Sequence, residues 1–88
     1  MIDIKLNHDQ ITKLMIEIEE RWNKRCRDKG YHIYNSRHEG LGILAEEYHE
    51  LLKAIRKPGT SLLRAEALDC IIPLLHLIAS IDTGQMEW

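Results

Sequence analysis

Proline, cysteine and long apolar runs are scarce in this sequence of 88 residues. The only prolines are Pro58 and Pro73, so few positions break a helix. The two cysteines, Cys26 and Cys70, have no C-x-x-C partner, which favours free thiols over a disulfide framework or a zinc site. No apolar run reaches the roughly 18 residues that a membrane span needs. Nor does the start of the chain read as a signal peptide. These absences predict a cytoplasmic protein with no membrane association.

A strong charge of one sign is also missing. Twelve Lys and Arg face 14 Asp and Glu, for a net charge of −2. General nucleic-acid binders are usually strongly basic, so no stable nucleic-acid binding is expected. Apolar residues make up 44% of the chain and charged residues 30%, which is typical of a folded globular protein. At this length we expect a single domain over residues 1–88.

Strand-type alternation is nearly absent, and three segments have helical spacing instead. The first segment follows Asn7, which can form a capping box with Gln10, and ends at Gly30. The second follows Ser36, which has the capping-box spacing with Glu39. It ends before Pro58-Gly59. Its apolar stripe predicts a seam that packs on another helix. The stripe consists of Leu41, Leu44, Tyr48, Leu51 and Ile55.

The third helical segment begins at Thr60 or Ser61 and runs to about Ile81. Apolar side chains cover it on more than one face, so it must be buried nearly all round. Two companion helices from so short a chain cannot cover it, and a second copy of the chain is the simplest partner. The sequence therefore predicts an all-α, antiparallel bundle of three main helices per chain, completed by oligomerisation.

Acidic residues recur in pairs on the second and third segments. Glu47 and Glu50 lie three residues apart, as do Glu66 and Asp69, so each pair projects from one face of its helix. If the helices are antiparallel neighbours, the two pairs can converge. Converging carboxylates repel one another, and oxygen-only ligands favour Mg²⁺, or Mn²⁺, as the counter-charge. The alternative is a solvated acidic face.

Two motifs resemble those of a known family. Leu44–Ile55, LAEEYHELLKAI, resembles the Leu-x-x-Glu-x-x-Glu-Leu signature of the MazG-like, all-α nucleoside triphosphate pyrophosphohydrolases. Glu66–Leu75, EALDCIIPLL, resembles their second signature, a Glu-x-x-Asp at the start of an apolar helix. The resemblance covers about residues 41–78, close to half of the chain.

The resemblance implies a single MazG-like domain that forms a homodimer or homotetramer. It also implies Mg²⁺-dependent hydrolysis of nucleoside or deoxynucleoside triphosphates to the monophosphate and pyrophosphate. By position, the metal ligands would be Glu47, Glu50, Glu66 and Asp69. Glu47 would also activate the attacking water, with Glu46 as the second candidate.

Other side chains have a functional and a structural interpretation. Lys53 and Lys57 can hold phosphates, or be solvated cations near a helix end. Trp22 can stack on a base, or pack in a core or an interface. Tyr48, on the apolar seam, is expected in the core. Pro73 departs from the family pattern, because relatives usually keep an uninterrupted helix there and often a side chain that contacts the substrate.

Two other functions compete with the pyrophosphohydrolase. One is a non-catalytic helical module for oligomerisation or interaction, whose acids are merely surface residues. The other is a ferritin-like di-metal carboxylate protein, which needs two Glu-x-x-His pairs. Glu46 and His49 form the only such pair, so this reading is disfavoured.

Overall fold

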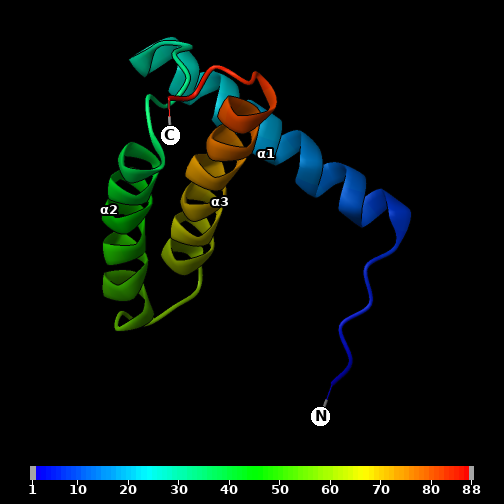
Figure 1. The fold of residues 1–88 in the computed structure, drawn as a ribbon. Coiled ribbons are helices and arrows are strands. Elements are labelled where there is room, and N and C mark those ends of the chain that lie inside the picture. Colours follow the sequence, from blue (N-terminus) through cyan, green and yellow to red (C-terminus); the bar gives the residue numbers. More distant parts are fainter. Residues whose placement is uncertain (1, 88) are drawn as a thin grey trace. The chain divides into compact units, whose positions relative to one another are not determined.

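The computed structural model describes residues 2–87, which form three helices and, within that range, no strand (Figure 1). They are α1 (His8–Lys29), α2 (Arg37–Ile55) and α3 (Ser61–Asp82). The predicted all-α class and the number of main helices are confirmed. The chain divides into two compact units, one ending at Gly30 and the other beginning at Tyr31.

The first unit contains α1, whose two ends match the signals in the sequence. The Asn7 side chain accepts the N–H of Gln10 at 2.9 Å, and the Gln10 side chain accepts the N–H of Asn7 at 2.9 Å. This reciprocal pair is the predicted capping box. At the other end Gly30 has φ 94°, a conformation that favours glycine, and its N–H donates to the Cys26 carbonyl at 2.7 Å.

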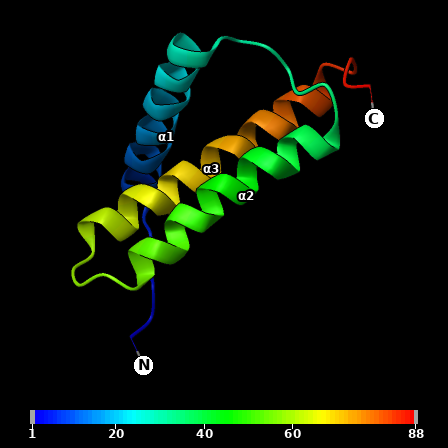
Figure 2. The ribbon, with the colours of Figure 1, turned by 90° about the vertical axis from the view of Figure 1, so that its left-hand side faces the viewer.

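The second unit is a helical hairpin in which α2 and α3 run antiparallel, side by side (Figure 2). The Ser36 hydroxyl accepts the N–H of Glu39 at 3.3 Å and caps α2 as predicted. Where α2 meets α3, Gly40 allows close approach. A Cβ at this position would lie 3.2 Å from Leu77 Cδ1.

The buried side of α2 differs from the predicted seam. Gly40 and Ala54 are buried, whereas Tyr48 is 53% exposed. The prediction that Tyr48 belongs to the core is therefore wrong for the single chain. Successive residues turn by about 100° around a helix, so contact through Gly40 rotates Leu41, Tyr48 and Ile55 away from α3.

The connector, residues 31–36 between α1 and α2, belongs to the second unit and is anchored on α3. Tyr34 is buried, and its N–H donates to the Ser80 hydroxyl at 3.0 Å. Ser80 in turn donates to the His76 carbonyl at 2.8 Å. His76 is only 4% exposed, lies with its ring centroid 4.4 Å from that of Tyr34, and donates from Nε2 to the His32 carbonyl at 2.6 Å. This network fixes the start of α2 relative to the C-terminal half of α3.

α3 continues through the buried Pro73 without a break in its assigned span. Within residues 2–87, no helix is both long and apolar enough to cross a membrane.

Candidate metal centre

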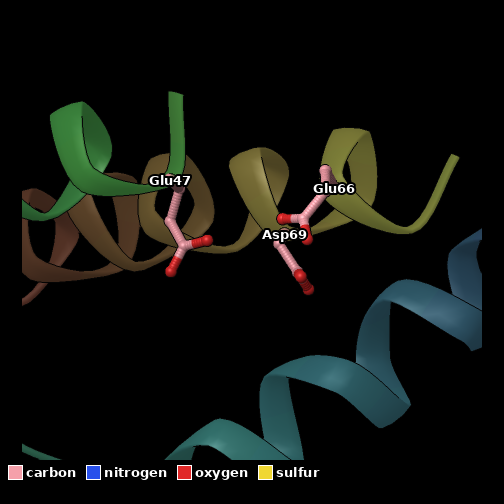
Figure 3. A group of neighbouring side chains, drawn as sticks. All are labelled: Glu47, Glu66 and Asp69. Atoms are coloured by element: carbon pink, nitrogen blue, oxygen red, sulfur yellow. The ribbon is translucent and has the colours of Figure 1, made fainter. Parts of the chain in front are cut away.

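The hairpin brings acidic side chains from two helices together. Glu47 lies near the middle of α2, and Glu66 and Asp69 lie in the first half of α3. The spacing of three residues puts Glu66 and Asp69 on one face of α3. Figure 3 shows the three carboxylates in one group.

The geometry of this group suits one divalent cation. One oxygen atom from each of Glu47, Glu66 and Asp69 lies within 4.8 Å of the others, and all three residues are partly buried. Oxygen atoms that share a Mg²⁺ or Ca²⁺ ion lie about 2.0–2.6 Å from it, and so roughly 3–5 Å from one another. Three carboxylates without nitrogen or sulfur ligands match the preference of hard cations.

The Cys70 side chain reports the electrostatics of the group. Partial burial raises the pKa of the Cys70 thiol above its ordinary value, and the negative charges of Glu47, Glu66 and Asp69 raise that pKa further. The negative charges of the group thus disfavour a further anion beside them, the Cys70 thiolate. A bound cation would offset this repulsion.

Glu50, the fourth acid predicted for the site, lies outside the group of three. Its Oε1 accepts a hydrogen bond from Lys53 Nζ at 3.2 Å, and the two side chains are 50% and 55% exposed. Spacing alone puts Glu47 and Glu50 on one side of α2. Glu50, however, sits where a nearby lysine on the same helix competes for its carboxylate.

The other predicted site residues lie in different surroundings. Glu46 is exposed on α2, and Lys57 is exposed in the loop after α2. Lys53 is the partner of Glu50. Trp22 is partly buried on α1, in the other compact unit.

Cys70 is not among the predicted site residues, although the charges of all three carboxylates raise the pKa of its thiol. The available signal was its place directly after Asp69 in the Glu-x-x-Asp motif. The sequence predicts only a free thiol here, because a lone cysteine without a partner motif has no predicted role.

Comparison of the chain with protein-family models, with curated proteins and with solved structures gives no match.

Proposed function

We propose that the α2–α3 hairpin is an Mg²⁺-dependent nucleoside triphosphate pyrophosphohydrolase centre. The observation that carries the proposal is the convergence of Glu47, Glu66 and Asp69 within 4.8 Å, from two helices. The order and spacing of these acids are also those of the MazG-like motifs that the sequence resembles. Water would attack a nucleoside or deoxynucleoside triphosphate to give the monophosphate and pyrophosphate.

Each acid has a role in this proposal. Glu47, Glu66 and Asp69 would hold Mg²⁺, or Mn²⁺, through their carboxylate oxygens. Such an ion would supply charge stabilisation for the phosphates and would lower the pKa of the attacking water. A Glu47 oxygen accepts the proton of the attacking water, and Glu46, exposed one residue earlier, is the second candidate for this role.

Glu50 enters the proposed site by exchanging its lysine partner for the metal. An exposed pair such as Glu50–Lys53 contributes only about 0.2–1 kcal/mol, so the exchange costs little. Lys53, once released, becomes available for a phosphate, and Lys57 in the next loop is a second candidate.

The experiment measures both metal binding and turnover. We expect Mg²⁺ to raise the melting temperature of the wild type by mass action, and pyrophosphate to be released from at least one member of a panel of ribo- and deoxyribonucleoside triphosphates. Glu47→Gln and Asp69→Asn should abolish the thermal shift and lower turnover by at least about 100-fold.

The matched control is Glu20→Gln on α1. Glu17 and Glu20 repeat the spacing of Glu47 and Glu50 but are expected to form a solvated face, so this variant should keep the thermal shift and the activity. Glu50→Gln should keep part of the thermal shift, because three carboxylates remain. A wild type with no thermal response to Mg²⁺ or Mn²⁺ and no pyrophosphate release from the whole panel would overturn the proposal.

One observation favours the second candidate, a non-catalytic helical module for oligomerisation. Large apolar side chains remain exposed along both helices of the hairpin, including Tyr48, Ile55 and Ile78. In this case the acids are surface residues. The homodimer or homotetramer expected from the sequence suits either function, so oligomerisation does not decide between them, whereas the metal response does.

A further inference from the structure

We infer that a hollow where α2 begins and α3 ends binds a small amphipathic carboxylate, a medium-chain aliphatic acid, at a site separate from the candidate metal centre. The hollow has a volume of about 460 Å³, which is within the usual range for ligand pockets. Its lining consists of Arg37 from the first turn of α2, Leu77 and Ile81 from α3, and Gly84 and Met86 from the segment after α3. All five residues belong to the second compact unit.

The segment after α3 is a preformed wall of this hollow, because hydrogen bonds hold it at both ends. The Gly84 N–H donates to the Ile81 carbonyl at 3.0 Å, and Gly84 has φ 71°, a conformation that favours glycine. Beyond Met86, the Glu87 N–H donates to the Asn35 carbonyl at 2.9 Å, so the segment returns to the connector just before α2 (Figure 1). A wall that is already ordered lowers the cost of binding a ligand.

Arg37 is the one charged residue in the lining. It is exposed, and no residue in the described range 2–87 forms an ion pair with it. Its planar guanidinium matches the two oxygens of a carboxylate. Arg37 is also the first residue of α2, and the N-terminus of a helix carries partial positive charge. This end of the hollow therefore suits an anion.

The rest of the lining and its neighbours decide the class of the anion. Leu77, Ile81 and Met86 supply apolar side chains and no second cation, so the ligand is apolar apart from one charged group. Two acids, Asp82 and Glu87, directly follow Ile81 and Met86 in the chain and oppose a doubly charged ligand. A phosphate monoester carries nearly two negative charges at pH 7, whereas a carboxylate carries one. A carboxylate with an aliphatic chain is therefore the better fit.

The hollow is distant from the three carboxylates of the candidate metal centre. Arg37 lies ten residues before Glu47 on α2, and Leu77 lies eight residues after Asp69 on α3. At 1.5 Å per residue, these separations are about 15 Å and about 12 Å along the helix axes. Repulsion between exposed charges at such distances is largely screened at physiological ionic strength. The hollow is thus a second site, and its ligand does not compete with a cation at the first.

The test is isothermal titration of the full chain with butanoate, hexanoate and octanoate, each below its micelle-forming concentration. We expect binding to tighten with chain length by up to about fourfold per methylene, because each buried methylene contributes about 0.8 kcal/mol. Octanol has the same chain length without the charge, and octylammonium has the opposite charge. Both should bind about tenfold or more weakly than octanoate.

Two pairs of variants locate the site. Arg37→Gln should weaken octanoate binding by about tenfold, whereas Arg56→Gln, the same change at the other end of α2, should leave it unchanged. Ile81→Ser should weaken octanoate and octanol alike. Ile55→Ser is its matched control, because Ile55 is 57% exposed against 55% for Ile81, and it should change neither affinity. Helical circular dichroism checks that each variant folds.

Several results would overturn the inference. They are equal affinities for octanoate and octanol, equal effects of Arg37→Gln and Arg56→Gln, and no octanoate binding either by calorimetry or by shifts of amide NMR signals. Binding to anionic lipid vesicles without binding of free octanoate would also overturn it, because the partner would then be a membrane surface. None of these measurements uses Mg²⁺ or a triphosphate, so they stand apart from the test of the proposed function.

Discussion

Gly40 and Gly42 on α2 have different surroundings, so substitutions there distinguish the effect of packing on stability from the effect of helix propensity. A Cβ at Gly40 would lie 3.1 Å from Tyr34 Cδ2 and 3.2 Å from Leu77 Cδ1, whereas a Cβ at Gly42 would have nothing within 4 Å. We expect Gly42→Ala to raise the free energy of unfolding by about 0.5–1 kcal/mol, because alanine is the better helix former. Gly40→Ala has the same propensity gain but crowds two side chains. Overpacking of this kind costs about 1–3 kcal/mol, so we expect a net loss.

Urea unfolding of both variants provides the measurement. Equal stabilisation by the two substitutions would mean that Tyr34 and Leu77 move aside without cost, which would contradict the close packing of Gly40.

The Cys70 thiol provides a reporter of the three carboxylates. Iodoacetamide reacts with the thiolate, and burial together with the neighbouring negative charges raises the Cys70 pKa. Alkylation should therefore be slower than that of a free cysteine below the ordinary thiol pKa of about 8.5, and should still rise with pH above it. Asp69→Asn removes one of the negative charges and should speed the reaction, while Glu20→Gln should not.

Peptide mass spectrometry separates Cys70 from the buried Cys26. The same shift has a consequence for stability. A thiol whose pKa is raised by folding stabilises the fold fully below the ordinary thiol pKa, and this contribution is lost as the pH rises through the folded-state pKa. A Cys70 rate and pH profile equal to those of free cysteine would contradict the electrostatic account.

At the level of helices, the ends were predictable and the packing direction was not. The caps at Asn7 and Ser36 depend on residues three positions away, so sequence alone locates them. The side of α2 that contacts α3 depends on α3 itself. The small residues Gly40 and Ala54 are buried, and the larger Tyr48 is exposed. The position of Glu50 outside the group of three has a similar reason, because spacing gives the face of a helix but not the ion pair with Lys53.

The hydrogen-bond network of Tyr34, His76 and Ser80 also could not be predicted from patterns in the sequence. Its partners are 46 and 44 residues apart in the hydrogen bonds that join the connector to α3. His76 and Ser80 lie one turn apart as polar residues in an apolar helix, which indicates that each needs a hydrogen-bond partner. The segment that they hold, however, had no pattern that linked it to α3.

This network predicts a strong effect of one small substitution. Ser80→Ala leaves the buried N–H of Tyr34 without its acceptor, which should lower the free energy of unfolding by about 1–3 kcal/mol. The exposed Ser61 at the first position of α3 provides the control, and Ser61→Ala should change stability by less than about 0.5 kcal/mol. Equal effects of the two substitutions in urea unfolding would show that the connector is not held by Ser80.

At the scale of the whole molecule, the hairpin has two chemically different sides. Apolar residues surround α3, so its sequence predicts that it needs a partner. The exposure of Leu41, Tyr48, Leu52 and Ile55 on α2 has no such signal, since it depends on the rotation of α2 about its own axis. The spacing of Glu66 and Asp69 is local to α3, so the sequence predicts that they share a face, whereas their approach to Glu47 also depends on how α2 packs against α3.

This two-sidedness has a consequence for ligand binding. If two copies pair through exposed side chains such as Tyr48, Ile55 and Ile78, the carboxylate groups lie away from that contact, and a ligand at one group does not touch the other. Without a shared element to couple them, the paired sites should titrate independently, with a Hill coefficient of one for Mg²⁺ and for the nucleotide. Isothermal titration of the wild type and of Ile78→Glu, a variant that places a charge in this apolar contact, should then give the same affinity per site, whereas sigmoidal binding by the wild type alone would reveal communication between paired copies.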